Sequence, residues 1–315
     1  MKAAASVVLF SVACTLLGCQ PMGPKETAMA QEESKEAGQL LVAVIGPKAG
    51  LMCITAEAGF AQPLWTWRPA EAPDLTPEQK TLFPPTEMNE CKPAVYRGER
   101  VILVSAWPTG FAVLRLSDRK ALFVAEAPRN VHSSEVLPDD NLVAVSSGGG
   151  DAVRVYSTTT GETRDYPLPG GHGVVWDAQR RRLWALGDKV LQRYSYNGTR
   201  DHPELTLEAA IGLPQAGGHD LYPRAGRDEL LVTTGDTVWV FDPDRQAFLP
   251  FAPLAQEKGN VKSVGECSPG GRIAYTLWDE SVRLLNPEGK LLFPDARLYK
   301  ARWNRLPEFT YSPGR

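Results

Sequence analysis

The sequence is poor in cysteine and histidine, and this scarcity limits the kinds of site that it can build. Only five cysteines and four histidines occur among 315 residues. Beyond the N-terminal segment the cysteines are Cys53, Cys91 and Cys267, and their spacing fits no CxxC metal site. An exported chain can form disulfides, so at most one pair of these three is possible and one thiol stays free. The cysteines therefore indicate a structural role.

A strong excess of charge and a long apolar run are also missing. The formal net charge of -3 lacks the basic surplus that is typical of nucleic-acid binding. Residues 3–13 are apolar and follow Lys2, but this stretch is too short to span a bilayer as a stable helix. No later apolar run is long enough to do so. We therefore expect no nucleic-acid partner and no transmembrane helix.

The N-terminal segment instead carries a targeting signal. Leu16-Leu17-Gly18-Cys19 resembles the bacterial lipobox, in which a small residue precedes the cysteine that becomes lipidated. This resemblance implies a signal peptide over residues 1–18, lipidation of Cys19 and membrane association through the acyl chains. An ordinary secretory signal cleaved nearby is the alternative. Since Gln20 and not Asp follows the cysteine, a host with two membranes would sort the protein to the outer membrane, where we expect it on the periplasmic face.

Two further segments follow Cys19. Residues 19–38 are rich in Glu, Lys, Pro and Ala and have no periodic apolar pattern, which predicts a flexible tether. Residues 39–315 form the body, whose length is compatible with a single all-β domain.

Internal repeats in the body predict its fold. Each repeat has a basic residue, a short apolar strand, a polar turn and a second apolar strand, as in residues 130–146, 170–186, 217–233 and 260–276. A third strand, a turn and an outer strand complete each unit. Four short strands repeating at about 40 residues are typical of a propeller blade.

Two less regular copies raise the number of blades to six. One copy occupies residues 90–126, and the other is split between the two ends of the chain. Residues 39–44, 50–55 and 64–68 supply three strands of the split copy, and residues 298–303 supply the missing first strand. The prediction is an all-β, six-bladed β-propeller that closes by pairing N- and C-terminal strands in one blade. Residues 69–88 are expected to form an excursion over one face.

Two motifs carry a resemblance to a known group. They are Trp65-Thr66-Trp67-Arg68-Pro69 and the segment 130–139, Asn-Val-His-Ser-Ser-Glu-Val-Leu-Pro-Asp. With them, the body resembles a family of secreted bacterial six-bladed propellers that is related in architecture to NHL and WD-repeat-like propellers. The turn at Asp139-Asp140-Asn141 departs from the Asp-Gly that is frequent in that family. The resemblance implies fold and export and brings no settled activity.

The repeated basic position supplies the candidate site. It begins each innermost strand and should bring six side chains to one mouth of the central channel: Lys92, His132, His172, His219, Lys262 and Lys300. With Glu135, these residues predict a binding site for an anionic small molecule, a glycan or a protein. A tryptophan near the mouth, among Trp107, Trp176, Trp184, Trp239 and Trp278, could stack on a sugar.

Two alternatives remain open at this point. His132, His172 and His219 could hold a divalent metal, with Glu135 as a fourth ligand or as a partner of the ligands. The chain would then be a lyase or hydrolase acting on acidic saccharides, and it loosely resembles the metal-dependent pectate-type propeller lyases. Alternatively, the repeated residues hold the blades together, and the propeller is an assembly module.

Overall fold

The computed structural model describes residues 38–47, 49–84 and 87–311. The predicted signal peptide and Cys19 lie outside these residues, as does the predicted tether up to residue 37. Within the described ranges, no helix has the length and apolar character that a membrane crossing needs.

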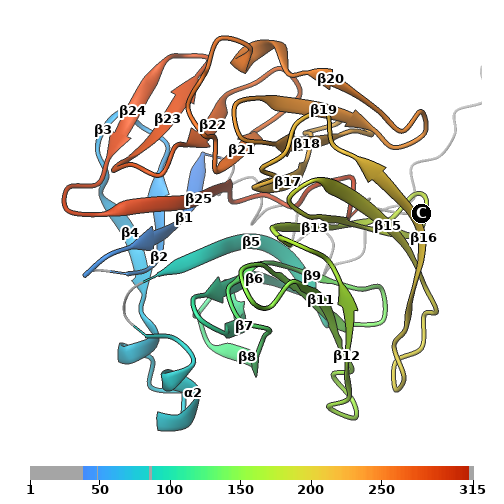
Figure 1. Cartoon of the computed structure of the whole chain (residues 1–315). Helices are drawn as coiled ribbons and strands as arrows, with labels where there is room; N and C mark the ends of the chain where they lie inside the picture. Colours follow the sequence, from blue (N-terminus) through green and yellow to red (C-terminus); the bar gives the residue numbers. More distant parts are fainter. Residues whose placement is uncertain (1–37, 48, 85–86, 312–315) are drawn as a thin grey trace, which may run out of the picture.

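The strands of the described chain form six antiparallel sheets arranged as blades around a common axis (Figure 1). Blade 1 contains β5 (Met88–Tyr96), β6 (Glu99–Ala106), β7 (Gly110–Arg115) and β8 (Ala121–Glu126). Blade 2 contains β9 (Val131–Val136), β10 (Leu142–Ser146), β11 (Ala152–Tyr156) and β12 (Thr163–Pro167). Blade 3 contains β13 (Gly173–Asp177), β14 (Arg182–Leu186), β15 (Val190–Tyr196) and β16 (Leu205–Gly212).

The remaining blades complete the circle. Blade 4 contains β17 (Asp220–Pro223), β18 (Leu230–Thr233), β19 (Val238–Asp242) and β20 (Ala247–Pro250). Blade 5 contains β21 (Ser263–Glu266), β22 (Ile273–Thr276), β23 (Ser281–Leu285) and β24 (Gly289–Leu292). Blade 6 contains β25 (Arg297–Trp303), β1 (Gln39–Ile45), β2 (Gly50–Thr55) and β4 (Pro63–Trp67). The all-β, six-bladed prediction is therefore confirmed.

Pairing of the two chain ends closes the ring, as the split repeat predicts. β25 pairs with β1 in antiparallel register, with Leu40 opposite Trp303 and Val42 opposite Ala301. The backbone N–H of Asn304 then donates to the carbonyl oxygen of Gln39 at 2.9 Å. The sequence did not reveal β3 (Gly59–Phe60), which leaves blade 6 and pairs in parallel with β24 of blade 5. The strands β1 to β4 thus contribute to blade 6 and, through β3, to blade 5.

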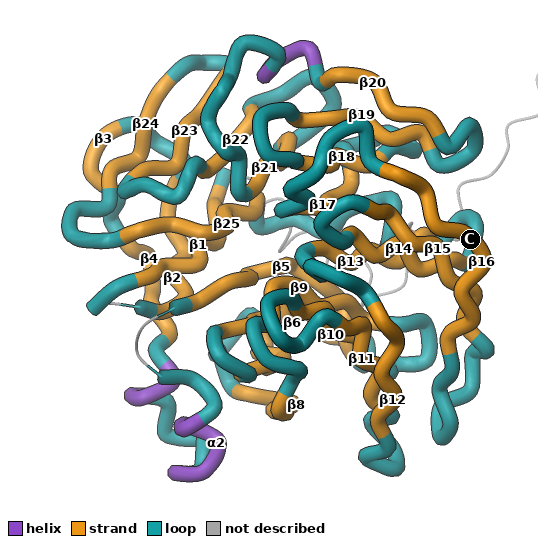
Figure 2. Tube along the Cα trace, viewed as in Figure 1, coloured by secondary structure: helices purple, strands orange, loops and turns teal. Residues whose placement is uncertain are grey.

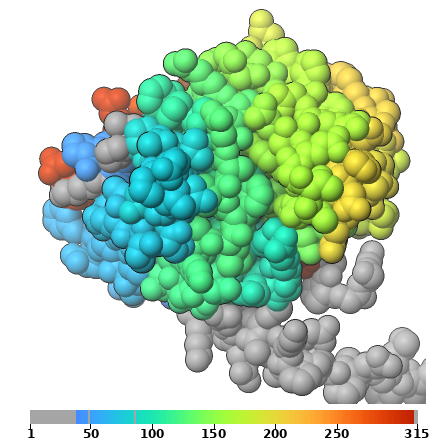
Figure 3. Space-filling model, turned by 90° about the horizontal axis from the view of Figure 1, so that it is seen from below, coloured from blue at the N-terminus to red at the C-terminus, as the bar shows by residue number. Residues whose placement is uncertain are grey.

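Face-to-face packing of neighbouring blades builds the core. Second strands such as β6 and β10 are buried almost throughout because they meet a neighbouring blade on each face. Outer strands such as β12 are mostly exposed and polar. On the side seen in Figure 3, successive blades lie in contact without open space between them.

The centre is packed closely enough to require a glycine. A Cβ atom on Gly173, the first residue of β13, would lie 2.6 Å from Cβ of Leu221 in β17. Any larger residue would push the innermost strands of blades 3 and 4 apart. This close approach of the innermost strands brings side chains of different blades into contact near the axis.

The excursion before blade 1 does not cover the central axis. It contains the 3-10 helix η1 (Pro69–Glu71) and the short helix α2 (Pro77–Thr81), which lie at the periphery (Figure 2). The Asp74 carboxylate accepts from the backbone N–H of Ala121 in the outermost strand of blade 1. Leu75 and Phe83 pack into the core shared by blades 1 and 6. A second 3-10 helix, η2 (Ala252–Leu254), connects blades 4 and 5.

Candidate functional site

The innermost strands begin at one face of the propeller, which we call the strand-start face, and end at the opposite strand-end face. Three neighbouring innermost strands, β25, β5 and β9, each contain an extra residue near their start. In β25 the single residue Ala43 of β1 faces both Tyr299 and Lys300. Such a bulge breaks the alternation of a strand and re-aims its side chains. Tyr299 and Lys300 can therefore both face the axis, although they are consecutive.

Six side chains form a closed circle near the strand-start face, which we call the axial ring. Its members are His132, His172, His219, Lys262, Trp278 and Tyr299. The imidazole of His172 stacks on that of His132 with centroids 4.2 Å apart. It also meets His219 edge to face at 5.2 Å.

The other half of the axial ring is cationic and aromatic. The Lys262 ammonium lies 3.0 Å from Nε2 of His219 and 5.7 Å from the centre of the Trp278 ring. Trp278 contacts Tyr299 edge to face at 5.1 Å, and Tyr299 lies 5.3 Å from His132. Trp278 comes from the turn after β22 and has a φ of +68°, a strained backbone for a bulky residue. Such strain persists only where surrounding contacts hold it.

Burial makes the imidazoles of the axial ring neutral. Burial and then the Lys262 charge lower the pKa of His219 to about 3. Burial lowers the pKa of His172 to about 4 and holds that of His132 well below its ordinary value. Burial also lowers the pKa of Lys262 to about 8, which leaves most of its ammonium protonated at pH 7. Lys262 is therefore the charged member of the axial ring.

The hydrogen bonds fix the tautomers of two imidazoles. An ammonium only donates, so Nε2 of His219 accepts from Lys262 and the ring proton sits on Nδ1. Nδ1 of His172 lies 2.7 Å from the carbonyl oxygen of Gly170, which only accepts. That nitrogen carries the proton, and Nε2 of His172 presents a lone pair. Within the described chain, neither ring nitrogen of His132 has a hydrogen-bond partner.

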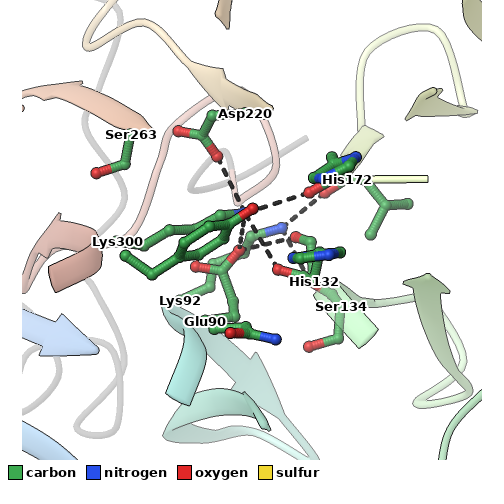
Figure 4. Close-up of polar contacts among 12 residues, drawn as sticks. Glu90, Lys92, His132, Ser134, His172, Asp220, Ser263 and Lys300 are labelled. Carbon is green, nitrogen blue, oxygen red and sulfur yellow. Dashed lines mark hydrogen bonds and ion pairs between the residues drawn. The ribbon is translucent and has the colours of Figure 1, made fainter. Parts of the chain in front are cut away.

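A buried ion network fills the axis beneath the ring. Its members are Glu90, Lys92, Glu135, Asp220, Lys300 and Arg302. Lys300 contacts Glu90 at 3.1 Å and Asp220 at 3.2 Å. Its ammonium also donates to the carbonyl oxygens of His132 and His172 (Figure 4). The Arg302 guanidinium bonds both carboxylates through paired contacts of 2.6 to 3.2 Å.

Strong pairing keeps the carboxylates of Glu90 and Asp220 ionised. Burial opposes the charged form of Glu90, but Arg302 and Lys300 outweigh it and lower the pKa of that carboxyl. The same two cations lower the pKa of Asp220 against its burial. For the Lys92–Glu135 pair, burial outweighs the attraction: it lowers the pKa of the Lys92 ammonium and raises the pKa of the Glu135 carboxyl. The network contains three acidic and three basic side chains, so its formal charges balance. It is a structural plug of the channel.

The positions of Lys92, Lys300 and Glu135 correct the expectation of an open basic mouth. Lys92 and Lys300 are buried, and the Lys92 ammonium donates to the carbonyl oxygens of Ser134 and Val174. Glu135 lies 3.5 Å from Lys92 and accepts from the Tyr311 hydroxyl. These three residues pack the blades together, because their long side chains reach across the axis to the neighbouring inner strands. They do not reach solvent at the mouth.

The imidazoles likewise do not form the metal site that was considered for His132, His172 and His219. Their rings contact one another by stacking and by an edge-to-face contact, and they do not converge on a common point. No group of three or more His, Cys, Asp or Glu among the described residues is placed to hold a metal ion. No disulfide joins Cys53, Cys91 and Cys267, the three cysteines of the described residues.

Sequence reasoning missed several residues at the axis. Tyr299 follows no repeated pattern, and Asp220 reads as a strand-end residue. Glu90 lies two residues before Lys92 in β5, and Arg302 lies two residues after Lys300 in β25. Both lysines occupy the repeated basic position. That spacing of two is the one available signal, because alternate strand residues share a face. Trp278 was considered for sugar stacking only as one of five tryptophans.

The C-terminal segment after β25 lies over the strand-end face. The Thr310 hydroxyl donates to the carbonyl oxygen of Trp176, and Ala178 donates to that of Phe309. Tyr311 reaches Glu135 from the same side. A small pocket at this face lies between this segment and the ends of β17 and β21. The axial ring therefore belongs to the face that this segment leaves free.

A family comparison places the chain among known sequences. The sequence profile of DUF6528, a family of unknown function, matches residues 11–314. The chain belongs to the DUF6528 family. None of the curated proteins compared matches this DUF6528 chain.

The fold of this DUF6528 propeller is similar to that of a chain in the crystal structure of a nidogen/laminin complex. The two chains share 14% sequence identity with a TM-score of 0.53. The similarity covers 85% of this chain and 99% of the other. At this identity the likeness supports the fold alone, and function has to be argued from the site.

Proposed function

We propose that this DUF6528 propeller is a binding module of the cell envelope that takes an anionic ligand at the axial ring. The observation that carries the proposal is the state of Lys262. Lys262 is partly exposed, its ammonium contacts a neutral imidazole, and no carboxylate among the described residues pairs with it. Each cation of the deeper network, in contrast, is bonded to carboxylates.

An anion at the strand-start face would gain more from Lys262 than from an ordinary surface lysine. The ammonium is half-buried, and the surrounding aromatic and imidazole rings exclude part of the water. A charge-assisted hydrogen bond in such surroundings is stronger than one in bulk solvent. The ring thus provides one preformed position for a negative group.

The envelope location is part of this proposal and rests on the sequence around Cys19. A lipid on Cys19 would hold the propeller at the outer membrane, with the tether as the connection. The metal-dependent lyase or hydrolase alternative gains no support from the stacked imidazoles. Lys92, Lys300 and Glu135 fit the alternative in which channel residues are structural.

Calorimetric titration of the full chain with D-galacturonate and with inorganic phosphate tests the proposal. We expect at least one of these anions to bind, and Lys262→Met to weaken that binding at least tenfold by removing the charge at similar length. Lys258→Met is the matched control, because Lys258 is an exposed lysine in the same connection between blades 4 and 5. Absence of binding by both anions, or equal affinity in wild type and Lys262→Met, would refute the proposal.

A further inference from the structure

The axial ring offers three different chemistries within a short distance. Lys262 provides one positive charge, and Nε2 of His172 provides a hydrogen-bond acceptor. Trp278 adds an aromatic ring that is only partly buried. His219 lies between two of them, since it contacts Lys262 and lies edge to face with His172, and Lys262 in turn lies over the Trp278 ring.

The single charge limits the kind of anion that fits. A dianionic phosphate or sulfate is normally held by several cations or by a bidentate guanidinium. In the axial ring one ammonium stands among neutral imidazoles, and the cations beneath are already paired. A monoanionic carboxylate matches this charge.

The acceptor and the aromatic ring specify what the carboxylate is attached to. A lone pair on His172 requires a donor, and a hydroxyl group supplies one. The face of Trp278 is suited to an apolar ring face, because an indole buries a large flat area. Hydroxyls, a carboxylate and an apolar face occur together in a uronic acid.

The backbone of Trp278 supports a role in recognition. Its φ of +68° lies in the left-handed region, which is a rare position for a large aromatic residue and favours glycine. Tyr299 and Lys262 hold the indole in place through an edge-to-face contact and a cation–π contact. Strained residues held by their surroundings gather at binding sites.

We infer that the axial ring recognises a carboxylated sugar, with Lys262 on the carboxylate, His172 on a hydroxyl and Trp278 against the sugar face. This inference rests on the proposed anion-binding function and names its ligand class. His132 stacks behind His172 and thereby supports the imidazole that would contact the hydroxyl.

Three probes separate the charge from the sugar ring. D-galacturonate has both, its methyl ester has the ring without the charge, and acetate has the charge without the ring. We expect D-galacturonate to bind at least tenfold more tightly than either of the others. Equal binding of acetate and D-galacturonate would overturn the carboxylated-sugar inference and leave the anion site intact. Equal binding of the ester would overturn both proposals, and so would an absence of binding by all three probes and by phosphate.

Three variants, two at Trp278 and one at His172, assign the contacts. Trp278→Gly suits the left-handed backbone, so the variant should fold, and it should lose the preference for D-galacturonate over acetate. Trp278→Phe retains an aromatic face and should keep most of that preference. His172→Phe keeps the stacking but removes the acceptor, and we expect weaker D-galacturonate binding with unchanged acetate binding. If neither Trp278→Gly nor His172→Phe changes the preference, the inference is wrong.

Discussion

Glu90 is the residue on which the centre of the propeller depends most. Its carboxylate is fully buried and bonds both Lys300 and Arg302 from the closing strand. Removing one partner from a buried ion pair leaves the others uncompensated in a medium of low polarity. The energetic weight of this side chain therefore exceeds that of any single surface ion pair.

We expect Glu90→Gln to lower the free energy of unfolding by about 3–5 kcal/mol, the range for breaking a buried pair. Glu99→Gln is the matched control, because Glu99 pairs with Arg115 at the surface and its loss should cost about 1 kcal/mol or less. Urea denaturation followed by tryptophan fluorescence measures both. Similar losses for the two variants would show that the network contributes no more than a surface pair.

At the residue scale, the sequence predicts which positions approach the axis but not how deeply each side chain lies. His132, His172, His219 and Lys262 do lie together near the strand-start face. Lys92 and Lys300 lie farther from the strand-start face, in the ion network beneath the axial ring. They extend from within β5 and β25 and not from the strand starts. The bulge at Tyr299 and Lys300 depends on pairing with β1, which is more than 250 residues away. No local pattern could reveal it.

Among the elements, β25 both joins the two ends of the chain and supplies two of the three basic residues of the ion network. It completes the sheet of blade 6 by pairing with β1, and it supplies Lys300 and Arg302 to the ion network. Its loss would expose the edge of β1 and leave Glu90 and Asp220 without their cations. Both effects would destabilise the folded propeller.

We expect a chain that ends after Asp295, without β25, to show no cooperative thermal unfolding. A chain that ends after Asn304 retains β25 and loses only the segment over the strand-end face. This control should unfold cooperatively at a lower temperature, since it lacks Phe309 in the core and the Tyr311 contact with Glu135. Circular dichroism during heating distinguishes the two chains, and cooperative unfolding of the shorter one would contradict the assigned role of β25.

The order of elements was accessible from the sequence for a physical reason. A blade cannot bury its faces alone, so every blade must repeat the same apolar strands and turns. The split blade could be recognised because the first repeat, residues 39–68, lacked a first strand. Residues 298–303 near the C-terminus formed a strand that belonged to no other repeat. β3 and the strand-end segment follow no repeat, and only tertiary contacts place them.

For the whole molecule, the neutral imidazoles couple stability to pH. The pKa values of His172 and His219 are about 4 and about 3 in the folded protein, and an unfolded histidine has a pKa of about 6.5. Between these values the unfolded chain binds more protons than the folded chain. Stability must therefore fall as the pH decreases from about 6.5 towards 4.

We expect each of the two histidines to contribute a slope on the order of 1 kcal/mol per pH unit between pH 6 and pH 5. A double variant with His172→Phe and His219→Gln lacks these groups and should lose less stability over this interval. Urea denaturation at closely spaced pH values measures the slopes. Identical slopes in wild type and variant would mean that the imidazoles are not buried in the neutral form.

Closure by the two chain ends also determines the face at which the chain enters the propeller. The chain enters the fold at Gln39, which lies beside Asn304 at the strand-end face, opposite the axial ring. With a lipid on Cys19, the point of attachment and the axial ring would therefore lie on opposite faces of the propeller. A ligand of the axial ring would then approach from the side of the propeller that the attachment leaves clear.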